Sequence, residues 1–296
     1  GIYLVVAFFP AWLLFLAPHL LEAREGLMEG LLISASWSAA MWMPGLGALA
    51  AVRWGEKKPL TTLNLGRLGP ARIYLWAWLI PILASLTTGG FTWLFGLGEF
   101  DPTFSVLQTV LAQSPQLTEI PLPLLVLGQV IAALTVAPLI NLALALGEEL
   151  GWRGYLLPAL LPAGQLRAVL LSGVIWGIWH APVILQGLNY PEHPVAGLGL
   201  MVLFCVLLGT FLSWLYFTTR SPWAPALSHG TVNAVAGLPL LFLSWVRLTW
   251  GGTLPSAVGL LVLGVLTFGV LQDSFDSAIV AAVDSESDEL EIVEFE

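Results

Sequence analysis

Hydrophobic residues in this chain come in long blocks, without the alternating or amphipathic patterns of soluble strands and helices. A helix needs about 20 mostly apolar residues to cross a hydrocarbon core of about 30 Å, and several blocks reach that length. The expected segments run approximately over 2–20, 31–52, 73–96, 121–147, 168–187, 196–218, 223–246 and 254–272. The pattern predicts an all-α fold, a polytopic transmembrane bundle of about eight helices.

The fourth block is unusually long, and from 121 to 161 its charged residues are Glu148, Glu149 and Arg153. At about 1.5 Å per residue, an unbroken helix there is roughly twice as long as a membrane is thick. Either the helix continues past the three charges and bends near Pro158, or a second apolar helix lies at the interface. Both arrangements place the three charges at or below the membrane surface.

Composition supports a membrane protein and divides the chain in two. The mean hydropathy is +0.87 and 10% of residues are charged, which is outside the soluble range. The net charge of −9 comes from residues 273–296, which hold nine acidic side chains and no Lys or Arg. We expect a single transmembrane domain over 1–272 and a solvated acidic cytoplasmic tail over 273–296. No basic cluster suggests nucleic acid, and Cys205 is expected to be a packing residue facing lipid or the core.

Basic residues indicate the orientation. Half of them lie in one connection, at Arg53, Lys57, Lys58, Arg67 and Arg72, whereas 97–120 has none. The positive-inside rule makes that connection cytoplasmic, and alternation then places Arg153 toward the cytoplasm. We expect a multi-pass protein of the plasma membrane with its N-terminus outside and its C-terminus inside. The opening 18 residues are interpreted as a first membrane helix, not as a signal peptide.

Polar residues inside membrane segments are costly and often functional. Besides the three charges, His180 lies within the fifth segment, and His229 and Asn233 open the seventh, four residues apart on one helix face. These side chains are able to hold a water or stabilise an oxyanion. His19 and His193 fall at segment ends or loops and are interpreted as interfacial.

Spacing separates the two glutamates. Glu149 and Arg153 are four residues apart with the acid first, which is the favourable order for a helical ion pair. Glu148 is rotated by about 100° and has no local cation. A carboxylate without a cation in an apolar site is suited to take up a proton, as a general base does.

Three stretches resemble the motifs of a known family. "EELGWR" fits EExxxR, "WGIWH" fits FxxxH with Trp176 in place of Phe, and "HGTVN" fits HxxxN. They arrive in the order found in the CPBP family, which comprises CAAX proteases and bacteriocin-processing enzymes. The resemblance covers about residues 121–246. Because Trp keeps an aromatic ring at position 176, this departure leaves the assignment in place.

The resemblance implies an intramembrane endopeptidase that cuts a membrane-associated peptide or protein, with the lipid bilayer as its surroundings. It implies that Glu148 activates the attacking water, that His180 positions water or binds metal, and that His229 and Asn233 line the oxyanion side. The chain has no HExxH zinc helix. His180, His229 and Glu148 are nevertheless candidate zinc ligands, so metal dependence stays open.

Two other functions remain as alternatives. One is a transporter in which the Glu, Arg and His residues form a proton relay, although that class often shows inverted repeats and none is seen here. The other is a non-catalytic immunity or scaffold protein that keeps the ion pair for folding.

Overall fold

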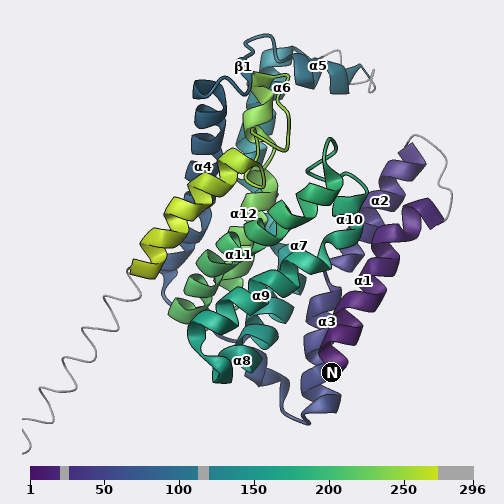
Figure 1. Cartoon of the computed structure of the whole chain (residues 1–296), viewed down its shortest axis with the longest axis vertical. Helices are drawn as coiled ribbons and strands as arrows, with labels where there is room; N and C mark the ends of the chain where they lie inside the picture. The colour runs from purple at the N-terminus through teal and green to yellow at the C-terminus, as the bar shows by residue number, and fades with distance from the viewer. Residues whose placement is uncertain (21–26, 113–119, 273–296) are drawn as a thin grey trace, which may run out of the picture.

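The computed structural model describes residues 1–20, 27–112 and 120–272, and these residues form a nearly all-α bundle (Figure 1). The predicted acidic tail over 273–296 lies outside the described residues. The helices are α1 (Ile2–Leu20), α2 (Leu27–Ala40), α3 (Met43–Ala50), α4 (Ala71–Leu94), α5 (Ser105–Leu111), α6 (Leu122–Leu134), α7 (Val136–Gly151), α8 (Leu157–Leu160), α9 (Gln165–Trp179), α10 (Ala181–Leu185), α11 (Pro194–Thr219), α12 (Trp223–Val235) and a last helix over Ala257–Gln272.

Short elements join them. Two π-helical turns, η1 (Ala51–Gly55) and η4 (Trp152–Leu156), continue α3 and α7. The 3₁₀ turns are η2 (Leu60–Leu63), η5 (Leu161–Ala163) and η6 (Leu238–Leu241). Strands β1 (Glu99–Phe100) and β2 (Leu243–Ser244) form an antiparallel pair with Glu99 opposite Ser244. The fold class is therefore nearly all-α, with one small departure that the hydrophobic blocks did not predict.

The number of membrane spans is smaller than predicted when each described helix is judged by length and composition. Helices α4 and α11 qualify alone, and α6 with the segment 136–163 adds a third as a bent pair. Three more apolar helices are shorter. The chain is thus a membrane protein, whereas the count of about eight spans is not confirmed. Predicted segment 223–246 shows one reason: α12 ends at Val235, because Pro239 follows two residues after Gly237.

The long fourth block is a helix that continues past the three charges. It bends by 44° between α6 and α7, at Thr135, and not near Pro158 as predicted. The physical reason is Pro138, whose ring clashes with the carbonyl four residues earlier in an unbroken helix. That carbonyl belongs to Leu134, and it accepts a hydrogen bond from Trp78 Nε1 at 2.9 Å instead.

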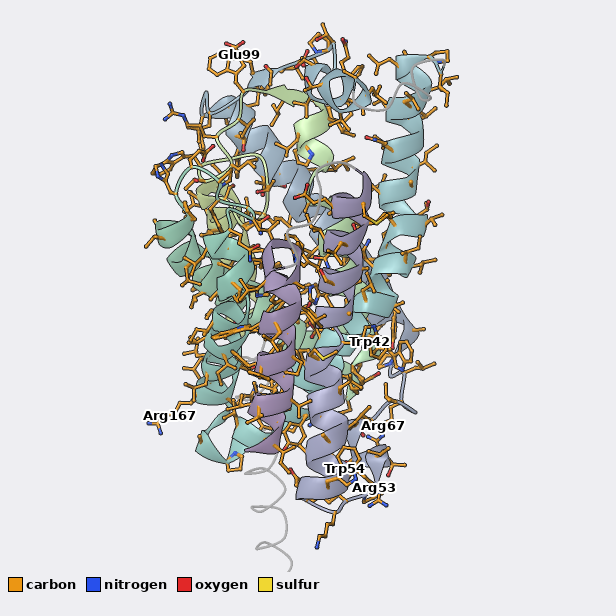
Figure 2. All side chains as sticks on the ribbon, turned by 90° about the vertical axis from the view of Figure 1, so that its right-hand side faces the viewer. Trp42, Arg53, Trp54, Arg67, Glu99 and Arg167 are labelled. Atoms are coloured by element: carbon orange, nitrogen blue, oxygen red, sulfur yellow. The ribbon has the colours of Figure 1, made fainter. Side chains whose placement is uncertain are left out.

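The basic connection and the N-terminus lie at the same end of the bundle. Figure 2 shows Arg53, Arg67 and Arg167 near the lower end and Glu99 near the upper end. A Cβ placed on Gly55 would lie 3.5 Å from Ile2 Cδ1, and Figure 1 marks the N-terminus at the same end. An external N-terminus and a cytoplasmic basic connection, both predicted from the sequence, are therefore incompatible in this fold. Helix α1 leads away from this end, and α2 and α3 lead back to it, so the chain at residue 55 lies on the same side as residue 2.

Helix α7 is held between α3 and α12, and η4, which continues it, contacts α9. Close approach to α12 requires a glycine, because a Cβ on Gly230 would lie 2.5 Å from Leu142 N. Small residues at such contacts let membrane helices pack backbone to backbone. Three of the largest fully buried side chains, Trp152, Trp176 and Trp179, come from η4 and α9. The packing brings the C-terminal end of α7 against α9 and α12, which carry the predicted histidines.

Candidate active site

Glu149 is anchored on both sides. Arg153 Nη1 lies 2.8 Å from each of its carboxylate oxygens, and His229 Nδ1 lies 2.8 Å from Oε1. Glu149 is fully buried and Arg153 is 1% exposed. The ion pair predicted from spacing is confirmed, and His229 joins it from α12. A charge buried this deeply is stable only with such partners, so Glu149 is occupied in holding α7 to α12.

Glu148 has a different set of partners. Its Oε2 accepts a hydrogen bond from Trp176 Nε1 at 2.7 Å and a second from Trp152 Nε1 at 3.2 Å. Within the described ranges no salt bridge reaches Glu148, and no side chain donates to its Oε1. The residue is 2% exposed. Among the described residues, Glu148 thus has no salt-bridge partner, as predicted, and its Oε1 accepts from no side chain.

Trp176 lies at the centre of the site. The guanidinium carbon of Arg153 sits 4.5 Å from the centroid of its ring, a cation–π contact. The rings of His229 and His180 lie 5.2 Å and 5.8 Å from it. Trp176 does more than keep an aromatic ring where the family motif has Phe, because its indole N–H donates the shorter hydrogen bond to Glu148.

The remaining predicted residues differ in placement. His180 caps the C-terminal end of α9, half-buried, with Nδ1 2.9 Å from the carbonyl oxygen of Trp176. Cys205 is fully buried with Sγ 3.8 Å from the same Nδ1, so it faces the core and not lipid. Asn233 is exposed, and no hydrogen bond joins its side chain to another described residue. The structure therefore brings five predicted residues together and leaves Asn233 at the margin.

Three side chains near the site were not predicted as site residues from the sequence. Trp152 and Trp176 both lie within the motifs, and their indole donors are a signal that the motif pattern alone did not use. Tyr3 comes from α1, with its ring centroid 6.1 Å from that of Trp152. Its hydroxyl is buried and has no hydrogen-bond partner among the described residues. Nothing in the local sequence around Tyr3 connects it to the motifs.

The donor set does not match a zinc site. Catalytic zinc takes three protein ligands from His, Glu, Asp or Cys within about 2.0–2.3 Å of a common centre. Across the described residues, no group of three or more such side chains is placed to hold a metal ion. His229 Nδ1 is already bonded to Glu149. Since the residues as placed do not fit a metal, we derive no reaction step through one.

A helical membrane protein with buried, unequally paired carboxylates at its centre belongs to a class in which intramembrane chemistry is expected. Residues 123–235 match the family model described as type II CAAX prenyl endopeptidase Rce1-like. Over these residues the match confirms the resemblance to the CPBP family of intramembrane proteases that the motifs predicted. The matched segment contains all six candidate site residues. No curated protein matches the chain.

Proposed function

We propose that this chain is an intramembrane endopeptidase in which Glu148 activates water to hydrolyse a peptide bond of a membrane-associated substrate. The observation that carries the proposal is the unequal pairing of two adjacent glutamates. Glu149 is neutralised by Arg153 and bonded to His229, whereas Glu148 is held through Oε2 only. A general base needs an oxygen able to accept a proton, and Glu148 has one in Oε1.

The proposed reaction uses the free oxygen of Glu148 and the two histidines. Glu148 takes a proton from water, and the water oxygen attacks the carbonyl carbon of the peptide bond. The proton passes to the leaving amine nitrogen as the C–N bond breaks, which returns Glu148 to its starting state. Because His180 Nδ1 is bonded to the Trp176 carbonyl, its Nε2 remains to orient the water. His229 Nε2 lines the side on which the oxyanion forms.

The proposed location is the plasma membrane, with the site opening toward the cytoplasm. Two features support this orientation. The basic connection lies at the lower end in Figure 2, and Arg153 belongs to η4, which leads into that end through α8. The proposed partners are the lipid bilayer and a membrane-associated peptide or protein, with no role for nucleic acid.

The test compares Glu148→Gln with the wild type. Loss of a general base should lower the cleavage rate by about 100- to 10,000-fold. The amount of folded protein should change little, because the amide still accepts the indole hydrogen bonds. Proteomics of membrane peptides in the two strains would identify the substrate. Glu56→Gln, at an exposed residue outside the motifs, is the matched control and should cleave normally. Identical peptide profiles at equal protein levels would support the transporter or scaffold alternative instead.

A further inference from the structure

Two indole donors converge on one oxygen of Glu148. Trp176 belongs to α9 and Trp152 to η4, yet both donate to Oε2 and neither donates to Oε1. The 2.7 Å bond from Trp176 is short, as is typical when the acceptor is a carboxylate. The carboxylate plane is therefore fixed by donors from two elements.

The Trp176 indole is itself fixed. It is 1% exposed, with Arg153 stacked on its face and His229 against it at 5.2 Å in an edge arrangement. Close packing of α9 on α11 fixes the backbone that carries the ring, since a Cβ on Gly177 would lie 2.5 Å from Val202 Cα. The ring thus connects the carboxylate of Glu148 to the charged pair of Glu149.

We infer that Trp176 is a positioning residue that sets which oxygen of Glu148 acts as the base. Its N–H holds Oε2, so Oε1 is presented to the attacking water. This inference rests on the proposed endopeptidase function and deepens it. Phe at this position would keep the ring and its contact with Arg153 but would lose the donor, so the hydrogen bond is a feature of this chain and not of the FxxxH pattern.

The test replaces the donor and keeps the ring. Trp176→Phe should lower kcat by about 10- to 100-fold, in the range expected for a lost hydrogen bond to a charged group, and should leave KM unchanged. Trp152→Phe should lower kcat less, because its bond is longer at 3.2 Å. Trp78→Phe is the matched control. It removes an indole hydrogen bond to the Leu134 carbonyl away from the site, so kcat per folded molecule should equal that of the wild type.

A second variant keeps the inference testable if Trp176→Phe folds poorly. Replacing Trp176 with 3-benzothienylalanine preserves the size of the indole and removes only the N–H, and it should lower kcat to the same extent. Wild-type kcat in that variant would overturn the inference, as would an equal loss of kcat in Trp78→Phe. Failure of the proposed function is distinguishable, because it would show as continued cleavage by Glu148→Gln.

Discussion

Glu149 and Asp101 are both buried carboxylates held by hydrogen bonds, but their partners come from different distances along the chain. Glu149 accepts hydrogen bonds from Arg153, four residues on, and from His229, which is 80 residues away. Asp101, in the turn before α5, accepts all its bonds from Thr103 and Ser105, within four residues. Figure 1 shows α5 and β1 at the upper end of the molecule, and the partners of Asp101 all belong to one local turn there. The partners of Glu149 come from η4 and α12, so the cluster around Glu149 depends on how distant helices pack.

The two regions, the interior cluster and the upper end with α5 and β1, are compared first by their orientation in the membrane. The test establishes which end of the molecule faces the cytoplasm. Leu60 and Val110 are exposed at 45% and 58% and lie on opposite sides of α4 in the chain. Cysteines placed there in a Cys205→Ala background should behave oppositely toward a membrane-impermeant maleimide. Position 110 should react in intact cells and position 60 only after lysis. The reverse pattern would place the basic end outside and contradict a cytoplasmic opening of the site.

Breaking the interior cluster should have the largest energetic effect. Arg153→Ala leaves the buried Glu149 without its cation, a change that costs about 3–5 kcal/mol in soluble proteins. We expect a large loss of folded yield and of thermal midpoint, measured by size-exclusion chromatography and thermal denaturation in detergent. Glu149→Gln combined with Arg153→Ala removes both charges and should recover part of the loss. A loss as large in Glu148→Gln would instead give both glutamates the same structural role.

The role of the histidines is tested next. If His180 orients water, His180→Ala should lower cleavage by about 100- to 1,000-fold, the cost of one catalytic hydrogen-bonding group. His193→Ala is the matched control, because His193 is an exposed loop histidine that should leave activity unchanged. We expect wild-type activity to resist a zinc chelator. Activity that tracks zinc occupancy in purified protein would refute the metal-free reaction while leaving the protease assignment in place.

The sequence predicted those features that depend on composition or on neighbours along one helix. Long apolar blocks indicated a membrane protein, and the spacing of four residues indicated the Glu149–Arg153 pair. Contacts between distant segments were not predictable in this way. The bond from Trp176 to Glu148 spans 28 residues and depends on how α9 packs against α7.

The same distinction explains the errors. Spacing placed Asn233 on the face of His229, yet neighbouring turns of α12 meet different surroundings and Asn233 is exposed. A bend near Pro158 was one of the two arrangements expected for the fourth block. The helix bends at Thr135 instead, because the ring of Pro138 clashes with the carbonyl of Leu134 in an unbroken helix. Hydropathy alone also joined the ends of α2 and α3 into one segment, although the structure breaks them between Ala40 and Met43.

The smallest expected effect is at Asp101, where hydrogen bonds from Ser105 and Thr103 hold the carboxyl pKa well below its usual range. Because the folded pKa is lowered, this contribution to stability is present above the unfolded pKa of about 3.9 and is lost as pH falls below it. Asp101→Asn should therefore lower the thermal midpoint slightly at pH 7, and the difference from the wild type should shrink at pH 3. Glu99→Gln, an exposed substitution on neighbouring β1, is the control and should leave the thermal midpoint unchanged at pH 7. A difference that stays constant between the two pH values would mean that the charge of Asp101 does not stabilise the turn, leaving only the shape of the side chain.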